Sequence, residues 1–175
     1  MTGITAPQVD MSRPGAGAIT GFKKQVLTED TTSTRTVATP QPVNFGTDKG
    51  WFIDLPDGGT GEEAAERVSV DPIIQLGTLV VASNVPSTET CLAGGSGWVN
   101  FLDIRTGANI PGSSPSPASV KVSGSLIVGI NIVKIGDQIK TIVTTADNQQ
   151  LTKDTPVQAT GVTGRRVVWR ELIVE

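Results

Sequence analysis

The hydrophobic positions of the chain gather in short runs of β-branched and aromatic residues separated by glycine and proline. Two of these runs, Pro72–Leu76 and Leu79–Ala82, are separated by Gly77–Thr78 alone. Such a two-residue connection suits a type II′ turn, because glycine accepts a positive φ at the first central position. Both runs are apolar at consecutive residues, so we expect a hairpin whose two faces are both covered.

Strands are also predicted on both sides of this hairpin. Gly50–Leu55 ends at a Pro-Asp-Gly-Gly turn, and Trp98–Asp103 follows the hairpin after a polar loop. In the turn after Trp98–Asp103, the Asp103 carboxylate can accept backbone N–H bonds while Gly107 takes a left-handed conformation. The hairpin and Trp98–Asp103 are therefore predicted to form a three-stranded meander, with Asn109–Ile110 available for a fourth strand.

A second β unit is predicted beyond the Pro/Ser-rich segment Ile110–Ala118, which has no capacity to bury a core. Its strands are expected at Val120–Val122, Ser125–Ile135 and Gln138–Thr145. Gly136–Asp137 connects the last two as another hairpin turn of the Gly-X type. The linker is therefore expected to separate two β units.

The sequence before Asn44 is rich in Thr, Pro, Gly and Ala and contains few apolar residues. We predict one strand at Gly21–Leu27 and a solvated loop over the acidic, Thr-rich stretch Thr28–Thr36. Glu62–Arg67 is the only helix-favouring cluster in the sequence, but it spans about one and a half turns and has no apolar stripe. It is therefore expected to be an exposed loop or a single turn.

These patterns divide the chain into three parts of one folding unit. The parts are an irregular, loop-rich segment over 1–45, a first β unit over 46–112, and a second β unit over 113–175. The second unit ends in a predicted closing strand at Arg165–Ile173. The predicted fold class is all-β with long irregular loops, and 175 residues suffice for one core.

Charge and composition exclude several functional classes. With 14 Lys and Arg against 17 Asp and Glu, the net charge of -3 provides no basic field for nucleic acid or anionic lipid. Histidine is absent, which removes the commonest general base and the commonest zinc ligand. No stretch approaches the roughly 20 apolar residues of a membrane span, and Met1–Pro14 lacks the features of a secretory signal. We therefore expect either a cytosolic protein or an excised piece of a longer one.

The aromatic residues and the single cysteine each have a functional and a structural interpretation. Trp51, Trp98 and Trp169 could form a carbohydrate-binding platform, but large aromatics on strands more often fill space between packed sheets. Cys91 can form no disulfide within this chain. In a secreted protein it could pair with a thiol elsewhere, although a small, semi-buried residue is the favoured interpretation.

Charged residues at strand ends are interpreted in the same way. Three arginines near the C-terminus could bind a carboxylate partner in forked pairs, but a solvated edge strand that discourages edge-to-edge pairing is favoured. They are Arg165, Arg166 and Arg170. Three aspartates could be paired carboxylates for acid-base chemistry, but each lies where aspartate caps a turn. They are Asp54, Asp71 and Asp103.

The loop Asn84–Gly97 is the candidate binding rim. Its Gly-Gly-Ser-Gly run lacks the Lys-Ser/Thr ending and the following helix that a phosphate-binding loop requires. An inter-strand loop is nonetheless where a binding surface would be sited. The candidate residues are Thr88, Glu89, Cys91, Gly94, Gly95 and Ser96.

The order of these segments resembles known β-propeller proteins. Val68–Gly107, with its tight glycine turn and its aromatic strand ending Leu-Asp-x-x-Thr-Gly, resembles one quinoprotein-like blade, of which a full ring needs about 4 to 8. Over about Lys49–Glu175 the chain resembles the C-terminal part of PilY-type type IV pilus proteins. The matching segments are Gly50–Leu55, Glu66–Val68 with Asp71–Pro72, Cys91 with Gly94–Trp98, Leu102–Asp103 to Thr106–Gly107, and Gly164–Arg166 with Trp169–Leu172.

The resemblance implies a C-terminal fragment of a modified propeller with no enzymatic activity. It implies a secreted protein at the pilus tip, cell surface or outer membrane, with roles in pilus assembly, surface attachment and twitching motility. The expected partners are minor pilins, the rest of the parent propeller, and a host or abiotic surface, with no nucleic acid and no membrane span. Residues 46–112 would then be a propeller-like blade.

No cofactor is expected in this chain. Some members of the family carry a calcium loop, but Glu29–Asp30 and Asp147–Asn148 do not supply the 6 to 8 oxygen ligands at loop spacing that calcium takes. Two alternative functions stay open at this point. The blade pattern also fits a remnant of a quinoprotein-type dehydrogenase, and the tryptophans also fit a lectin-like carbohydrate-binding module.

Overall fold

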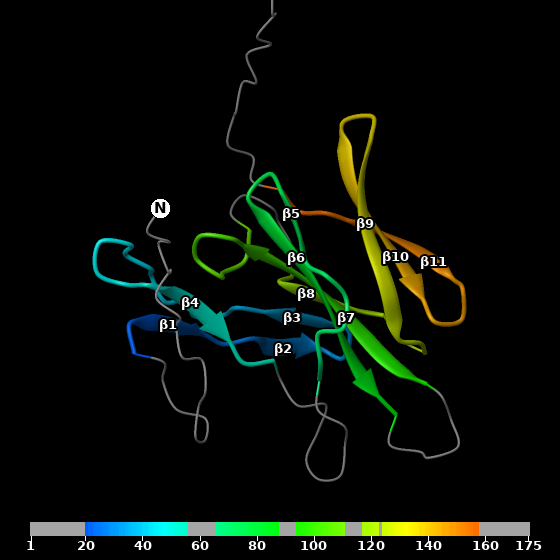
Figure 1. The fold of residues 1–175 in the computed structure, drawn as a ribbon, viewed down its shortest axis with the longest axis horizontal. Coiled ribbons are helices and arrows are strands. Elements are labelled where there is room, and N and C mark those ends of the chain that lie inside the picture. Colours follow the sequence, from blue (N-terminus) through cyan, green and yellow to red (C-terminus); the bar gives the residue numbers. More distant parts are fainter. Residues whose placement is uncertain (1–19, 56–65, 88–93, 111–116, 123, 158–175) are drawn as a thin grey trace, which may run out of the picture.

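All regular elements that the structure describes are β-strands, which confirms the all-β prediction for this part of the chain (Figure 1). The structure is a computed structural model. It describes residues 20–55, 66–87, 94–110, 117–122 and 124–157. Its strands are β1 (Phe22–Gln25), β2 (Thr28–Thr31), β3 (Thr34–Thr36), β4 (Gly50–Ile53), β5 (Ile73–Gln75), β6 (Thr78–Pro86), β7 (Gly95–Asp103), β8 (Ser119–Val122), β9 (Ile127–Ile135), β10 (Gln138–Thr145) and β11 (Gln150–Asp154).

The strands form three sheets, and none of them closes on itself within the described residues. The largest has six antiparallel strands in the order β2-β3-β8-β7-β6-β5. A second sheet contains β11, β10 and β9, and a parallel pair is formed by β1 and β4. The central sheet contains the predicted three-stranded meander, β5-β6-β7, which is therefore confirmed.

The fourth strand of the meander is β8, and Asn109–Ile110 forms no strand. We expected Val120–Val122 to belong to the second β unit. Instead β8 pairs with β7, with Val120 opposite Val99 and Val122 opposite Gly97. Val122 is 2% exposed and lies in the core beside Val99, so burial of its side chain favours this position. The division of the chain into three units stays a prediction.

The first hairpin turn lies one residue earlier than predicted. Gln75 pairs with Thr78, so the central residues are Leu76 and Gly77, at φ +46° and +80°. Positive φ at both positions is typical of a type I′ turn, and not of the predicted type II′ turn. Thr78 is therefore a buried strand residue, and its hydroxyl donates a hydrogen bond to the carbonyl oxygen of Pro156 at 2.7 Å.

The second predicted hairpin is confirmed. Ile135 pairs with Gln138 across Gly136–Asp137, and Gly136 has φ +60° as the first central residue of a Gly-X turn requires.

In the N-terminal part, the predicted strand at Gly21–Leu27 is confirmed by β1, whereas the predicted solvated loop at Thr28–Thr36 is wrong. These residues form the β2-β3 hairpin, which extends the central sheet through β8. Threonine is β-branched and fits a strand well, so its abundance here indicates a strand as readily as a loop. Of the predicted Glu62–Arg67 segment, the structure describes Glu66 and Arg67, and Arg67 makes an isolated β-bridge with Asn84.

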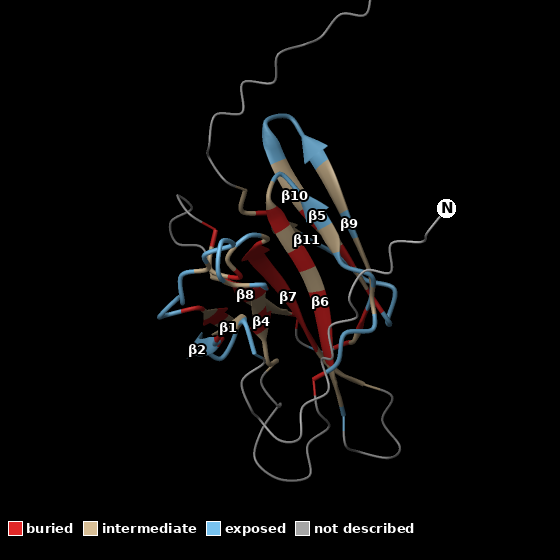
Figure 2. Ribbon diagram, turned by 60° about the vertical axis from the view of Figure 1, so that its left-hand side comes forward, coloured by how far each residue is buried: buried red, intermediate tan, exposed pale blue. Residues whose placement is uncertain are grey.

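The central sheet carries a core on each of its faces. Residues of β6 and β7 on one face pack against the sheet of β9, β10 and β11, in a cluster that includes Val80, Phe101 and Val143. On the other face Leu102 packs with Leu27 and Val37 and with the partly buried Trp51 of β4. Figure 2 shows the buried residues concentrated on the neighbouring strands β6 and β7.

The expectation that both faces of the first hairpin are covered therefore holds for β6 and fails for β5. In β6, Val80 and Ala82 are fully buried on one face, and Leu79 and Val81 on the other face are half-buried. In β5, Ile74 is 59% exposed, because this short strand lies at the edge of the sheet.

Asn84 and Gly97 fix the position of the second sheet on the central sheet. The Asn84 side chain makes two hydrogen bonds with the backbone of Ile127, accepting from its N–H at 2.7 Å and donating to its carbonyl oxygen at 2.8 Å. A Cβ atom on Gly97 would lie 2.6 Å from the Ile127 side chain. The missing side chain at Gly97 therefore allows β9 to approach β7 closely.

Candidate functional site

A buried ion pair lies on the face of the central sheet where β3, β6, β7 and β8 come together. Arg35 donates from Nη1 to both carboxylate oxygens of Glu66, at 3.1 and 2.9 Å. The two side chains are only 2% and 0% exposed. The guanidinium of Arg35 also lies 3.7 Å from the centre of the Trp98 ring. A cation in this position is attracted by the negative face of the indole.

Three uncharged side chains extend this ion pair across the sheet. The Ser83 hydroxyl donates to Glu66 Oε1, and Asn100 Nδ2 donates to the Ser83 hydroxyl oxygen at 3.0 Å. The Ser119 hydroxyl in turn donates to Asn100 Oδ1. We call Arg35, Glu66, Ser83, Asn100 and Ser119 the polar network.

Every buried side-chain nitrogen and oxygen of the polar network has a hydrogen-bond partner. Among the described residues, no buried side-chain nitrogen or oxygen lacks a hydrogen-bond partner. A catalytic or ligand-binding group needs at least one polar atom that is aimed at a substrate. The arrangement therefore supports a structural function, which is to hold the β2-β3 hairpin and the Glu66 segment on β6, β7 and β8.

No sequence pattern predicted this network. Arg35 lies in the stretch that was expected to be solvated, and Glu66 lies in the short cluster that was expected to be exposed. The two residues are separated by 31 positions, so their pairing has no local pattern. Arg35 stands between two threonines, Thr34 and Thr36, which favour β-strands. This pattern is the signal that could have placed Arg35 on a strand.

The predicted packing function of two tryptophans is confirmed. Trp98 is 2% exposed beneath Arg35. Trp51 is half-buried, and its indole N–H donates to the carbonyl oxygen of Ile104 at 3.0 Å. The third tryptophan, Trp169, lies outside the described residues, as do Arg165, Arg166 and Arg170.

The turn after β7 has the predicted geometry. The Asp103 carboxylate accepts the N–H of Arg105 at 2.8 Å, and the Asp103 carbonyl accepts the N–H of Gly107 at 2.7 Å. Gly107 has φ +68°, and a Cβ atom at this position would lie 2.4 Å from the Trp51 ring. The prediction of a capped turn with a left-handed glycine is therefore confirmed. Close contact with Trp51 is a second reason for glycine there.

The three candidate aspartates lie on separate segments of the structure. Asp103 caps the turn after β7, Asp71 precedes β5, and Asp54 follows β4. Asp54 forms an ion pair with Lys24 of the neighbouring strand β1, at 2.9 Å. No group of three or more acidic, histidine or cysteine side chains that could hold a metal ion occurs in the part of the chain that the structure describes.

Asp147 and Asn148 belong to the turn between β10 and β11. The Thr145 hydroxyl donates to Asp147 Oδ1, and this hydrogen bond lowers the pKa of the Asp147 carboxyl below its ordinary value. The Ser125 side chain acts on the same carboxyl in the same direction. Asp147 is thus held as a turn cap.

The candidate binding rim is only partly described. Thr88, Glu89 and Cys91 lie outside the described residues. Gly94 accepts the N–H of Ser87 at 2.8 Å, and Gly95 and Ser96 form the start of β7 opposite Pro86 and Val85. A Cβ atom on Gly95 would lie 2.3 Å from the carbonyl oxygen of Val85. Glycine is therefore required at this position for packing, and the binding function of the rim stays a prediction.

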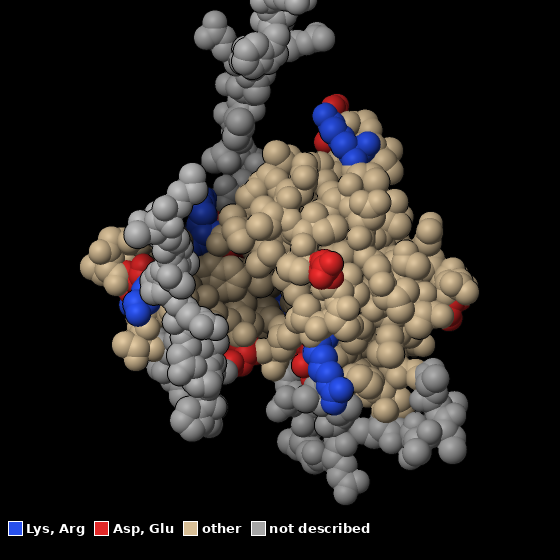
Figure 3. All heavy atoms as spheres, viewed as in Figure 1, with Lys and Arg blue, Asp and Glu red and all other residues tan. Residues whose placement is uncertain are grey.

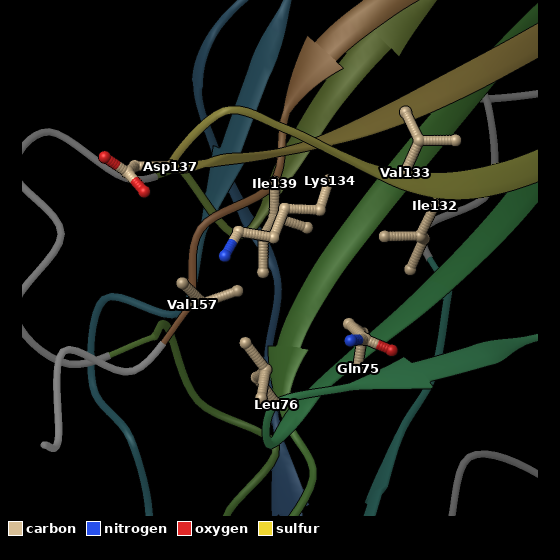
Figure 4. Close-up of a pocket in the computed structure, with 8 residues that line it drawn as sticks. All are labelled: Gln75, Leu76, Ile132, Val133, Lys134, Asp137, Ile139 and Val157. Carbon is tan, nitrogen blue, oxygen red and sulfur yellow. The ribbon is translucent and has the colours of Figure 1, made fainter. Parts of the chain in front are cut away.

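Among the hollows that the described residues form, two lie beside the central sheet. One, of about 200 Å³, lies between β4 and the central sheet and is lined almost wholly by apolar side chains, including Trp51, Leu79 and Leu102. The other, of about 440 Å³, lies between the Leu76 turn and the β9-β10 hairpin (Figure 4). We call the second hollow the turn groove. Its lining residues are Gln75, Leu76, Ile132, Val133, Lys134, Asp137, Ile139 and Val157.

The face shown in Figure 3 carries few charges, and those visible are scattered and of both signs. The part of the chain that the structure describes contains no helix that is long and apolar enough to cross a membrane.

Comparison with known proteins finds two similar curated proteins from Xylella fastidiosa strain Temecula1, each named a type IV pilus biogenesis factor PilY1 homolog. One is 27% identical over 105 residues, which cover 59% of this chain and 7% of that protein. The other is 30% identical over 158 residues, which cover 79% of this chain and 12% of that protein. No family model matches the chain, and no solved structure matches it significantly.

The chain thus spans roughly a tenth of the length of the curated relatives that it matches. Identity of 27 to 30% over most of the chain agrees with the resemblance of its ordered segments. The two similarities support a distant relationship of this chain to PilY-type type IV pilus biogenesis factors.

Proposed function

We propose that this chain is a non-enzymatic, β-rich module of a type IV pilus biogenesis factor. The observation that carries the proposal is its similarity to two PilY1 homologs, of which the longer match covers 79% of the chain. The saturated polar network is consistent with a module that folds and binds without catalysing a reaction. The module would act outside the cytoplasm, at the pilus tip or on the cell surface.

Within the parent protein we propose that the module is part of a modified β-propeller. The support for this assignment is the antiparallel order β5-β6-β7-β8, since four-stranded sheets repeated around an axis build propellers. The turn after β7, packed on Trp51, would close the blade at one rim. A structure of the full-length parent with β5-β8 in a separate, non-radial sheet would refute the propeller assignment.

We further propose that the module supports surface attachment and twitching motility through other pilus components. Minor pilins and the rest of the parent protein are the partners that this function requires. The candidate rim, where β6 connects to β7, would present the contact surface, because loops at sheet ends tolerate the variation that binding surfaces need.

The proposal is tested by substituting single residues of the protein through its chromosomal gene in the native organism. Arg35→Met leaves Glu66 buried without its partner, and we expect it to destabilise the module strongly and to reduce surface pili and twitching zones. Glu29→Gln alters a 57% exposed partner of Arg35 and should leave both unchanged. Pili are counted by electron microscopy and twitching is measured as zone diameter.

The decisive control is deletion of the whole gene. Normal piliation together with normal attachment in the deletion strain would show that the protein has no function in pilus biogenesis. If deletion removes pili but Arg35→Met does not, the parent protein acts in biogenesis without this module.

A further inference from the structure

The turn groove contains an exposed leucine in an unfavourable conformation. Leu76 has φ +46° and is 56% exposed. Left-handed backbone is disfavoured for leucine, because its Cβ approaches the neighbouring carbonyl oxygen, and Asn-Gly is the usual sequence for such a turn. The described fold therefore gains little from a leucine at this position. A contact that covers the side chain would explain why a large apolar residue occupies it.

The other wall of the groove is also apolar and incompletely covered. Ile132 of β9 and Ile139 of β10 are half-buried and lie across the hollow from the Leu76 turn (Figure 4). At the hairpin tip, Lys134 and Asp137 are exposed and add one charge of each sign to the lining. A suitable occupant has apolar side chains in its centre and charges of both signs beside them.

The chain itself is anchored at this groove just before its C-terminal segment. Pro156 accepts the Thr78 hydroxyl at 2.7 Å, and Thr155 donates its N–H to the Ile139 carbonyl at 3.0 Å. The hydroxyls of Thr141 and Thr155 share a further hydrogen bond of 2.6 Å. Val157, two residues after Thr155, lines the groove. The last described residue, Val157, therefore lies at the groove wall.

The sequence of 158–175 has the composition that the groove requires. It contains Trp169 within an apolar run, Val167–Trp169, flanked by Arg166 and Arg170 and followed by Glu171. Trp169 follows Val157 by 12 positions (169 − 157), and extended chain spans about 3.3 Å per residue, so its side chain can reach any part of the groove. A segment tethered this closely has an effective concentration of about the millimolar range.

We propose that the C-terminal segment 158–175 of the same chain occupies the turn groove, with Trp169 as its main apolar anchor against Leu76. The basic residues beside Trp169 then lie near Asp137, and Glu171 lies near Lys134. The contact buries the exposed leucine and joins the end of the chain to the two hairpin tips. This inference does not depend on the proposed pilus function.

Disulfide trapping in the full-length chain tests the proposal. On a Cys91→Ser background, Gln75→Cys places a thiol in the groove without altering Leu76. Val168→Cys or Arg170→Cys places the second thiol beside Trp169 and retains the anchor. The matched control is Phe45→Cys, a 63% exposed position outside the groove, with the same second cysteines. Products of mild oxidation are resolved on a non-reducing gel and mapped by mass spectrometry.

We expect the Gln75 pairs to form an intramolecular disulfide about ten-fold faster than the Phe45 pairs. Equal rates for the two sets would mean that the segment does not settle in the groove, and would overturn the proposal. Covalent dimers as the main product would overturn it as well, because the segment of a second copy would then be the occupant.

Tryptophan fluorescence provides an independent measurement without introduced thiols. The difference between the full chain and its Trp169→Phe variant gives the emission of Trp169, which we expect at short wavelength, as for a shielded indole. Leu76→Asn should shift this emission to longer wavelength, while Val26→Asn, at a 55% exposed position elsewhere, should not. A Trp169 emission that is the same in the presence and absence of Leu76 would refute the assigned contact.

Discussion

The Arg35 guanidinium is held by its ion pair with Glu66, by hydrogen bonds to both carboxylate oxygens of Glu66, and by the face of the Trp98 ring. Its partner Glu66 is inaccessible to water, and Glu66 also accepts the Ser83 hydroxyl. Breaking a buried pair by removing one partner is far more damaging than removing both, because an unpaired charge stays in a medium of low dielectric constant. The network should therefore respond strongly to single substitutions.

Arg35→Met is expected to lower the free energy of unfolding by about 3 to 5 kcal/mol. The double variant Arg35→Met with Glu66→Leu should recover part of this loss, because no buried charge is left. Glu29→Gln, which alters the exposed second partner of Arg35, should change stability by less than about 1 kcal/mol. Urea unfolding followed by circular dichroism measures all three variants, and a double variant less stable than Arg35→Met would contradict the argument.

A comparison of two glycines at positive φ distinguishes the energetic cost of backbone strain from the cost of steric overlap. Gly107 at φ +68° faces the Trp51 ring, whereas Gly136 at φ +60° has open space where a Cβ atom would lie. Alanine at Gly136 should cost about 1 to 2 kcal/mol from strain alone. Alanine at Gly107 should cost about 2 to 4 kcal/mol, because overpacking against the indole is added. Equal losses in thermal unfolding would mean that Trp51 moves away without cost.

Individual elements depend on partners that are distant in the sequence. The second sheet is joined to the central sheet through hydrogen bonds from one side chain, Asn84, to the Ile127 backbone 43 positions away. The β2-β3 hairpin is attached through β8 and through the polar network. Both attachments bring together segments that local sequence patterns treat as independent.

Asn84→Ala should loosen the second sheet selectively. The substitution leaves the Ile127 N–H and carbonyl without their partner, at a cost of about 2 to 4 kcal/mol. Amide hydrogen exchange should accelerate more in β9-β11 than in β2-β3. Asn131→Ala, at an exposed position of β9, is the control and should change stability by about 0.5 kcal/mol or less. A uniform acceleration would indicate that the sheets open together.

Prediction from the sequence succeeded where local chemistry specified the conformation. Gly136–Asp137 and the Asp103–Gly107 turn were identified because glycine and aspartate have few other reasons to occupy those positions. The turn at Leu76 was misplaced by one residue, since no propensity rule assigns a positive φ to leucine. The Thr28–Thr36 hairpin was missed because its threonines were interpreted by polarity and not by their branched shape.

The candidate site was less predictable than the fold. Burial of Trp98 followed from its position on a strand, but the cation above it comes from Arg35, 63 positions earlier (98 − 35). Long-range pairing of this kind is decided by the assembled sheet order, which neither composition nor periodicity encodes. The similarity to pilus proteins could be recognised from ordered segments of the sequence, whereas the packing of the side chains could be seen only in the three-dimensional structure.

At the scale of the whole molecule, the strands β6 and β7 serve as the shared wall of two cores. Alternate residues of the same ribbon point to opposite sides, so Val80 and Phe101 belong to one core and Leu102 to the other. Ordinary antiparallel ribbons have a water-facing side on which mutations accumulate freely. Here that side is missing over most of the ribbon, so this segment should tolerate far fewer substitutions than any other strand pair. Variation during evolution or engineering is thereby directed to the edge strands and to the hairpin tips.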